Sequence, residues 1–341
     1  MRDLLVIGGG PAGLAGALYA ARAGLDVTVW DKRAGIIDKA CGEGLMPGAV
    51  TALADIGVAP RGEDLVGIRY LAGDRAVEAT FRSGLGRGVR RTTLHTEMRS
   101  AAEAAGIPLE HQCAREIRPD PDGVVVDGQR FRHVLAADGL HSPVRRLLGL
   151  DGRPSPRRRY GMRRHYRLAP WTSFVEVHWG ESAEAYVTPV AGDVVGVTLL
   201  TSARGSFADN LAQFQSLRAR LRDAAPLGDV LGAGPLRQRA RSRVVGRVLL
   251  VGDAGGYVDA LTGEGVAMAV TQARAAVAAI LDDDPMRYEH DWHTITRRYR
   301  MLTSSLLGAT RLRPIRRALV PTAARLPGVF SAAVNSLARP A

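Results

Sequence analysis

The sequence predicts an α/β fold in which a mainly parallel β-sheet covered by helices carries an inserted antiparallel sheet and ends in further helices. Three observations predict this fold. A buried N-terminal strand runs through a glycine-rich turn into a helix, two later buried strands end at an aspartate next to a glycine, and short valine- and threonine-rich strands occupy the middle. The chain has 341 residues, 46% of them apolar and 23% charged, as is typical of a globular protein.

The first element is the segment "DLLVIGGGPAGLAGALYAARAGLDVTVWDKR". Gly8 allows a tight turn after the strand, Gly10 lets a pyrophosphate approach the helix N-terminus, and Gly13 lets the helix pack on the strand. Asp31 ends the second strand, where a carboxylate would accept hydrogen bonds from ribose hydroxyls. The pattern predicts a Rossmann-like dinucleotide site. Its further expected contacts are Pro11, Ala12, Lys32 and Arg33.

Two later segments indicate which dinucleotide binds. "FRHVLAADGLHSPVRRLLG" places Asp138 after a strand and resembles the DG motif of the group A flavoprotein monooxygenases. "GRVLLVGDAGGYVDALTGEGVAMAV" resembles the second FAD fingerprint of that superfamily, in which the aspartate, here Asp253, holds the ribityl chain. The resemblance implies bound FAD, with Gly263, Gly265 and Val266 at a helix N-terminus that faces the flavin. Such a terminus stabilises the negative charge of reduced flavin.

A fourth motif lies between these segments. Arg91 and Leu94 match an RxxL pattern that, in this superfamily, opens a helix beside the cofactor, and Ala114 falls where relatives contact the adenine. The sequence contains no second GxGxxG followed by an acidic residue. NADPH or NADH is therefore expected to bind transiently over the flavin, without a domain of its own.

The loop "GIIDKACGEGLMPG" follows the ribose-binding acid. The resemblance implies that this loop runs along the cofactor, with Cys41, Gly42 and Gly44 against the flavin ring, where glycine lets the backbone pass close. "KACGEGL" resembles the loop of the geranylgeranyl reductase family. An alternative interpretation gives Lys39 the role of the catalytic lysine of flavin-dependent halogenases, whose WxWxIP signature this chain lacks. Cys41 is either a buried space-filler or a residue that tunes the flavin or the substrate.

The inserted sheet is predicted from "FVEVHW", "EAYVTPV" and "DVVGVTLL". The expected domains are a discontinuous FAD-binding domain (1–60, 89–156 and 235–284), a β-sheet substrate domain (61–88 and 157–234) and C-terminal helices (285–341), an arrangement similar to that of aromatic hydroxylases. The segment "RLRPIRRALVPTAARLPGVF" alternates basic and apolar residues at roughly helical spacing. It is either a helix packed on its own domain or one that lies on a membrane surface.

The motifs support two enzymatic functions. The first is an NAD(P)H-dependent monooxygenase, in which O2 adds at C4a of reduced FAD and the hydroperoxide hydroxylates a hydrophobic aromatic, polyketide or quinol-type substrate. Its catalytic candidates are Cys41 and Tyr186, and His165 and His178 are further groups that could orient a phenol. The second is a geranylgeranyl reductase-like enzyme that reduces isoprenoid double bonds. Cys41 favours the reductase, but only Pro189 of the YxWxFP motif of that family survives, so the sequence favours the hydroxylase.

Composition bears on partners and location. The net charge of +12 comes from arginines, since Lys32 and Lys39 are the only lysines, and the chain has no recognisable RNA module. We therefore expect no nucleic-acid partner, although an RNA-binding flavoprotein is a third alternative. No apolar run is long enough to span a membrane and no targeting segment precedes the first strand, so a cytoplasmic location is expected. Two cysteines without zinc-ligand spacing predict neither a disulfide framework nor a metal site.

Overall fold

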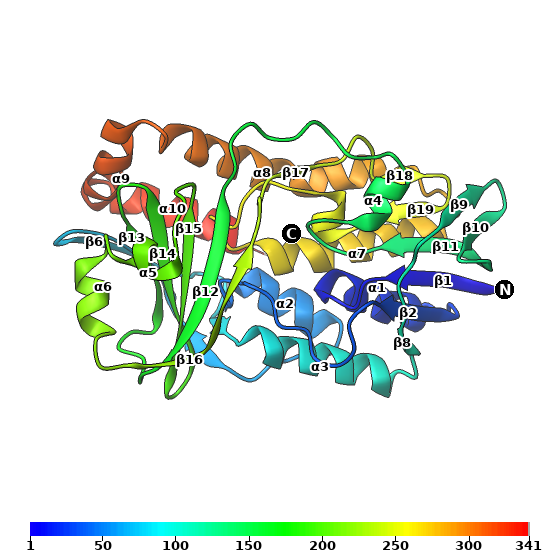
Figure 1. Cartoon of the computed structure of the whole chain (residues 1–341), viewed down its shortest axis with the longest axis horizontal. Coiled ribbons are helices and arrows are strands. Elements are labelled where there is room, and N and C mark those ends of the chain that lie inside the picture. Colours follow the sequence, from blue (N-terminus) through cyan, green and yellow to red (C-terminus); the bar gives the residue numbers. More distant parts are fainter. Residues whose placement is uncertain (340–341) are drawn as a thin grey trace.

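The computed structural model describes residues 1–339, which form two large β-sheets, two small ones and the helices that join and cover them (Figure 1). The helices are α1 (Pro11–Arg22), α2 (Pro47–Asp55), α3 (Arg91–Ala104), α4 (Pro143–Leu147), α5 (Phe207–Leu211), α6 (Gln215–Arg220), the 3-10 helix η1 (Gly252–Gly255), α7 (Gly265–Leu281), α8 (Arg287–Ala309), α9 (Arg313–Arg325) and α10 (Pro327–Ala338).

The first large sheet has the strand order β18-β19-β11-β1-β2-β8, with a β9–β10 hairpin attached to β11. Its strands are β1 (Arg2–Ile7), β2 (Val27–Asp31), β8 (Leu109–His111), β9 (Ile117–Asp120), β10 (Gly123–Val126), β11 (Gln129–Ala136), β18 (Val244–Val245) and β19 (Val248–Leu250). The pairs of β1 with β2 and with β11 are parallel, as are β11 with β19 and β2 with β8. Helices α1, α3 and α7 pack on one face, whereas α4 and the hairpin cover the other. The strands are continuously apolar because both faces are buried.

The second large sheet has the order β16-β12-β15-β14-β13-β5-β6. Its strands are β5 (Gly67–Ala72), β6 (Arg75–Thr80), β12 (Tyr160–Arg167), β13 (Phe174–Trp179), β14 (Ala183–Ala191), β15 (Val194–Thr201) and β16 (Ala225–Ala233). All neighbours pair antiparallel except β13 and β5, which are parallel. The predicted α/β fold with an antiparallel insertion is confirmed. The parallel pair arises because β5 comes from an earlier segment of the chain and joins the sheet beside β13 without a hairpin.

The two faces of the second sheet are covered by different helices. On one face Leu199 packs in a cluster with Phe207 of α5 and Leu217 of α6. On the other face Val177 shares a cluster with Phe330 of α10, together with residues of α8 and α9. Figure 1 shows this sheet and α9 at one end of the molecule and the β9–β10 hairpin at the other. The C-terminal helices therefore form one wall of the space beside the sheet.

Two small sheets complete the fold. They pair β17 (Gln238–Arg239) with β20 (Gly256–Tyr257), and β3 (Gly44–Leu45) and β4 (Glu63–Leu65) with β7 (Gly86–Gly88). Both lie at the junction of the large sheets, since β3 follows the loop after β2 and β20 follows η1. No helix within residues 1–339 is both long and apolar enough to cross a membrane.

Candidate active site

A cavity of about 1560 Å³ lies between the two large sheets. Small-molecule pockets occupy roughly 300–1,000 Å³, so this cavity has room for a dinucleotide and a second molecule. We call two groups of its lining residues the polar arm and the apolar arm; Arg158, Arg204 and other lining residues on or beside β12 and β15 belong to neither. The polar arm is lined by the N-termini of α1, α3 and α7, the loop 32–43 and Asp138. The apolar arm is lined by β5, β13, β14, α8, α9 and α10.

Most of the predicted site residues line this cavity. These are Gly10, Pro11, Ala12, Lys32, Arg33, Cys41, Gly42, Gly44, Arg91, Asp138, Tyr186, Asp253, Gly263, Gly265 and Val266. Gly8, Gly13, Asp31 and Ala114 are not among the lining residues. Segments far apart in the sequence thus meet at one place, as the order of the motifs predicts.

Gly8 and Gly13 shape the first turn from behind. Gly8 has φ +111°, and a Cβ there would come within 2.4 Å of the Ala137 carbonyl oxygen. A Cβ on Gly13 would come within 1.8 Å of the Gly8 carbonyl oxygen. Both positions therefore require glycine so that α1 can approach β1 and β11. The turn brings the α1 N-terminus to the cavity with its cap, Gly10, making no side-chain capping bond.

Asp31 is not among the residues that line the cavity. Its carboxylate is held by hydrogen-bond donors of the protein itself. Oδ2 accepts a hydrogen bond from the Gly9 amide at 2.8 Å, and Oδ1 accepts one from the Arg33 amide at 2.8 Å, with Arg33 Nε at 3.1 Å. Burial acts to raise the pKa of Asp31, but these hydrogen bonds outweigh it and lower the pKa. The carboxylate fastens the glycine turn to the end of β2, and Lys32 and Arg33 line the cavity there.

Sequence reasoning missed His95 of α3. Its Nε2 lies 2.8 Å from the Gly9 carbonyl oxygen and its Nδ1 accepts a hydrogen bond from the Ile37 amide at 3.2 Å, an arrangement that places the ring proton on Nε2. Burial lowers the pKa of His95, which keeps the ring neutral. The histidine joins the glycine turn to the loop 32–43. The only signal in the sequence is its position directly after the RxxL leucine.

Two ionisable side chains of the polar arm, Asp138 and Arg91, have unused hydrogen-bonding capacity. Asp138 Oδ2 accepts from the Val144 amide at 2.9 Å, but its buried Oδ1 has no partner within residues 1–339. The buried Arg91 Nη1 likewise has none among the described residues. Burial raises the pKa of Asp138 and of Asp253, and Lys39, Arg91 and Arg145 oppose the rise at Asp253. A ligand that donates to the carboxylates and accepts from Arg91 would satisfy these groups.

The N-terminus of α7 forms the opposite wall of the polar arm. Gly263, Gly265 and Val266 line the cavity, and the cap residue Glu264 makes no side-chain capping bond. Glu264 is buried and its Oε2 has no partner in the described part of the chain. Burial raises its pKa to about 7. The helix terminus therefore presents free amide groups and positive potential to the cavity.

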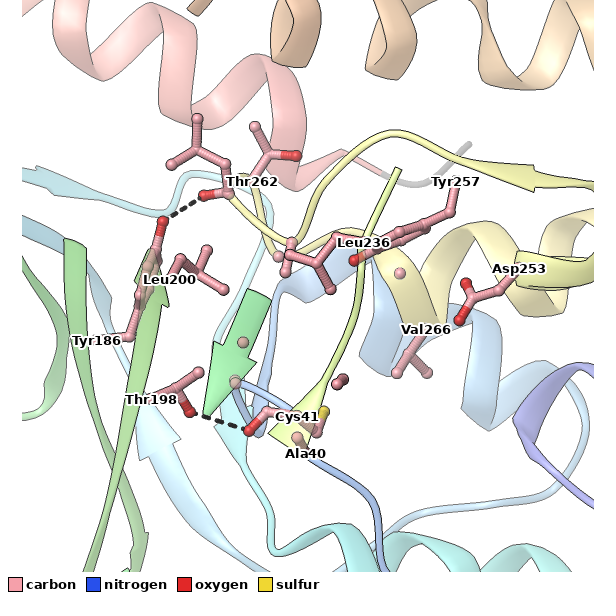
Figure 2. Close-up of a pocket in the computed structure, with 18 of the residues that line it drawn as sticks. Ala40, Cys41, Tyr186, Thr198, Leu200, Leu236, Asp253, Tyr257, Thr262 and Val266 are labelled. Carbon is pink, nitrogen blue, oxygen red and sulfur yellow. Dashed lines mark hydrogen bonds between the residues drawn. The ribbon is translucent and has the colours of Figure 1, made fainter. Parts of the chain in front are cut away.

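The loop 32–43 is held against the second sheet by backbone carbonyls. Thr198 Oγ1 of β15 donates to the Cys41 carbonyl at 3.1 Å, and Thr188 Oγ1 of β14 donates to the Gly42 carbonyl at 2.8 Å. Figure 2 shows Cys41 beside Thr198 within the cavity. The Glu43 amide donates to Cys41 Sγ at 3.4 Å. Burial raises the pKa of the Cys41 thiol, so the thiol keeps its proton.

Glu43 anchors the end of that loop. It adopts φ +59° and is 3% exposed. Its Oε1 accepts from the Arg91 amide at 2.7 Å, and its Oε2 lies 2.6 Å from His165 Nε2. Arg163 of β12 also bonds Asp38 and donates to the Lys39 carbonyl at 3.2 Å. A charged network from β12 and α3 thus fixes the loop, and the sequence contains no local pattern that predicts it.

Other predicted residues serve as walls or lie elsewhere. Tyr186 lines the cavity, but its hydroxyl donates to the Leu261 carbonyl at 2.8 Å (Figure 2), and burial raises its pKa well above the usual value. His165 pairs with Glu43, and His178 Nε2 lies 3.2 Å from a carboxylate oxygen of Glu176; neither ring is among the lining residues. Ala114 is buried in the core behind the first sheet.

The inserted sheet led us to expect a hydrophobic substrate, but the sequence did not predict that the C-terminal helices would line an apolar arm with it. Its lining residues from β5, β13, β14, α8, α9 and α10 include no charged side chain. They are Ile68, Tyr70, Val175, Val177, Tyr186, Leu302, Ser305, Leu306, Ala309, Leu319, Phe330, Ala333, Val334 and Leu337. The arm therefore offers an elongated chain of carbon atoms a place out of water.

Residues 1–282 match the family described as FAD binding domain. Two enzymes are similar in sequence over most of their length. "Menaquinone reductase" of Mycolicibacterium smegmatis is 29% identical over 335 residues, 86% of this chain and 80% of its own. "Digeranylgeranylglycerophospholipid reductase 1" of Methanothermobacter thermautotrophicus is 27% identical over 317 residues, 83% of this chain and 78% of its own.

Solved structures of different activities share the fold. A geranylgeranyl bacteriochlorophyll reductase-like protein from Thermoplasma acidophilum has a TM-score of 0.78 at 20% identity over 94% of this chain and 90% of its own. The flavin-dependent halogenase CmlS has a TM-score of 0.76 at 22% identity over 89% of this chain, which spans 62% of the halogenase. The fold alone does not separate reduction from halogenation.

The residues of the polar arm fit FAD. A dinucleotide brings ribose and ribityl hydroxyls that can donate to Asp138 and Asp253, and a pyrophosphate that can accept from Arg91 and an uncapped helix N-terminus. A Cβ built on Gly10, Gly42 or Gly265 would meet no other described atom within 4 Å, so the space in front of these backbones is open. The hydrogen-bond donors and acceptors of the polar arm and the open space in front of its glycines are thus consistent with FAD, the cofactor that the family description names.

Proposed function

We propose that this chain, which belongs to the FAD binding domain family and is an FAD-dependent oxidoreductase, reduces carbon–carbon double bonds in the isoprenoid chain of an amphipathic lipid. Menaquinone and digeranylgeranylglycerophospholipids, the compounds in the names of the two similar enzymes, share a polar head and long unsaturated isoprenoid chains. That shared chemistry supports the substrate class.

The observation that carries the proposal is the uncharged lining of the apolar arm. An isoprenoid chain has no hydrogen-bonding group, and each buried methylene contributes about 0.8 kcal/mol. Phe330 and Val334 of α10 face Tyr70 of β5 and other sheet residues within one apolar cluster. A phenolic or quinol ring would need polar partners along this arm, whereas the Tyr186 hydroxyl is already bonded to Leu261.

In this proposal Asp138, Asp253, Arg91 and the N-termini of α1 and α7 hold FAD in the polar arm. FAD, when bound and reduced, supplies a hydride. Saturation of a double bond also needs a proton for the second carbon. Cys41 Sγ lies on the cavity wall and holds its proton because burial raises its pKa. We assign the proton transfer to this thiol, with Thr198 and Glu43 holding the loop in place.

The departure from the YxWxFP motif leaves one of its positions on the cavity wall. Tyr186 occupies the position of the tryptophan and lines the cavity, whereas Thr188 occupies the position of the phenylalanine and, from outside the lining, donates to the Gly42 carbonyl. The hydroxylase and the transient NAD(P)H site stay predictions from the sequence. The thiol and the uncharged arm favour the reductase over the hydroxylase.

A substrate with long isoprenoid chains resides in membranes, so we also propose that the C-terminal helices dock on an anionic bilayer. The exposed apolar side chains Leu312, Ile315, Leu326 and Val329 lie on or next to α9 and α10. Exposed arginines such as Arg313 and Arg325 lie among them and complement anionic lipids. Sedimentation with vesicles of anionic lipid should carry the protein down, and an equal partition with neutral vesicles or none would contradict docking.

Anaerobic turnover tests the function directly. The FAD-loaded protein would be incubated in D2O with a reductant, either NADPH, NADH or dithionite. The substrate would be a geranylgeranyl-bearing phospholipid or menaquinone, and the masses of the products would be measured by mass spectrometry. The proposal predicts products with two hydrogens added per reduced bond, at least one of them deuterium because the thiol proton exchanges with D2O; with dithionite as the reductant both come from the solvent. A parallel reaction with a phenol or quinol under labelled O2 tests the hydroxylase; incorporation of the oxygen label there, with no reduced isoprenoid in the anaerobic reaction, would establish the hydroxylase instead.

A further inference from the structure

A second, smaller cavity of about 230 Å³ lies on the other side of the segment formed by η1 and β20. Gly252, Asp253, Tyr257 and Gly265 line both cavities, so only this segment and the start of α7 separate them. The other walls come from β17, α7 and α8. Four arginines line it, Arg237, Arg239, Arg243 and Arg300, and we call it the arginine pocket.

The positive charge of the arginine pocket is poorly balanced. Arg243 pairs with Glu289, but within residues 1–339 Arg237, Arg239 and Arg300 make no ion pair. Burial lowers the pKa of Arg237, and the charges of Arg239, Arg311 and Arg300 lower it further. Burial and the charges of Arg243 and Arg239 likewise lower the pKa of Arg300. The guanidinium groups repel one another, and an anion between them would relieve that repulsion.

Trp292 supplies a donor without an acceptor. Its indole lies between two guanidinium groups, with Arg243 Cζ 4.2 Å and Arg300 Cζ 5.0 Å from the ring centroid. The side chain is 3% exposed and lines the pocket, yet its Nε1 has no hydrogen-bond partner within the described residues. A buried donor without an acceptor destabilises the protein, and a ligand oxygen that accepts from it would remove that cost.

We propose that the arginine pocket binds the phosphate group of an anionic ligand. Guanidinium groups recognise phosphate through paired N–H donors, and the pocket combines several of them with the Trp292 N–H. Its volume suits a phosphate or pyrophosphate moiety but is below the roughly 300–1,000 Å³ of pockets that enclose a whole small molecule. Asp253, the one carboxylate among its lining residues in 1–339, restricts the phosphate to the arginine side.

The proposal that the arginine pocket binds phosphate does not depend on which bond the enzyme reduces. The phosphate belongs either to a nucleotide that delivers electrons or to the head of a lipid. Both share the same chemistry at the pocket, and binding experiments can separate them. Occupation would place a charge behind Asp253 and the start of α7, at the wall of the polar arm.

Calorimetric titration of the FAD-loaded protein with inorganic pyrophosphate tests the site, because bound FAD already fills the polar arm. Saturable one-to-one binding is expected, weakened at least about tenfold by the double substitution Arg237→Gln and Arg239→Gln. Arg115→Gln removes an exposed arginine that makes no ion pair with any residue in 1–339 and serves as the charge control. Trp292→Phe removes the N–H and should weaken binding about threefold or more. Absence of saturable binding, or equal weakening in the Arg115 control, would overturn the proposal.

Two further titrants identify the source of the phosphate. Adenosine 2′,5′-bisphosphate stands for the nucleotide and glycerol 1-phosphate for the lipid head. Tighter binding of one than of pyrophosphate, with the same dependence on Arg237 and Arg239, supports the site and assigns its source. If either titrant binds with the same dissociation constant to the wild-type protein and to the variant with Arg237→Gln and Arg239→Gln, the arginine pocket is not its binding site.

Discussion

The two arms of the main cavity are built in opposite ways. In the polar arm, turns and helix N-termini face the cavity, and Asp138 and Arg91 each have a buried polar atom without a partner within residues 1–339. In the apolar arm, side chains from three β-strands and three helices line the cavity, and none of these side chains is charged. The difference shows that one arm is arranged to satisfy a polar ligand and the other to exclude water.

The arms also differ in how their positions are fixed. The polar arm depends on contacts close to glycine turns, such as the Gly9 amide on Asp31. The loop that carries Cys41 lies at the boundary and is tied to β12, β14 and β15 by Arg163, Thr188 and Thr198. A change at the boundary should therefore affect chemistry, whereas changes within either arm should affect one ligand and leave the other bound.

The largest effect is expected at the boundary. Cys41→Ala removes the thiol that we assign to proton transfer, and loss of such a group costs about 10²–10⁴-fold in rate. The turnover number with an isoprenoid substrate should fall by that amount while FAD content stays unchanged. Cys113→Ala removes the other, exposed cysteine and is the control. Turnover in Cys41→Ala equal to that of the control would show that the thiol carries no proton.

In the polar arm, Asp253→Asn should weaken FAD binding. Loss of a charge-assisted hydrogen bond to a hydroxyl costs about 1.5–3 kcal/mol, or roughly 10- to 100-fold in the dissociation constant. Fluorescence titration of the apoprotein measures it. Asp74→Asn in the exposed β5–β6 turn is matched in chemistry and should leave the constant unchanged. An unaltered constant in the Asp253 variant would remove this residue from the cofactor site.

The buried Glu264 makes the polar arm sensitive to pH. Its folded pKa of about 7 exceeds the usual 4.5, so the folded state binds its proton more tightly than the unfolded chain does. Its contribution to stability is complete below pH 4.5 and is lost as pH rises to 7. Glu264→Gln should therefore raise the free energy of unfolding at pH 8 by about 1–3 kcal/mol and leave it unchanged near pH 4.5. Denaturant unfolding at both values measures it, and equal effects at both would contradict the shift.

In the apolar arm, Val334 of α10 has a matched control in Val230 of β16. Val334 is 5% exposed and lines the cavity, whereas Val230 is 39% exposed and is not among the lining residues. Val334→Thr puts a hydroxyl where an apolar chain would lie and should lower kcat/KM for an isoprenoid lipid about 5- to 30-fold, which corresponds to about 1–2 kcal/mol. FAD binding should not change. A similar loss in Val230→Thr would show that the arm does not discriminate.

Much of the polar arm could be predicted because its motifs are local. The glycine turn, the DG segment and the GD segment each reveal a strand, a turn and a helix start within about 20 residues, and the structure brings them together. Asp31 illustrates the limit, since spacing placed it correctly at the end of β2 but could not show that Gly9 and Arg33 already hold its carboxylate.

The rest could not be predicted because its contacts are distant in the chain. Glu43 meets His165 across 122 residues, and Tyr186 meets Leu261 across 75. The apolar arm brings residues of β5 and α10 together. In the sequence, each of these two segments has the pattern of an ordinary strand or helix whose apolar residues pack in a core. No periodic pattern distinguishes an apolar side chain that packs from one that lines a cavity.

Photolabelling tests the central claim that the apolar arm holds the isoprenoid chain. The FAD-loaded protein would be irradiated with a geranylgeranyl lipid that carries a diazirine at the far end of its chain, digested and mapped by mass spectrometry. The account predicts adducts on apolar-arm residues such as Leu306, Phe330 and Val334, which excess unlabelled lipid abolishes. Adducts confined to exposed residues such as Leu326 and Val329, with none in the arm, would contradict it.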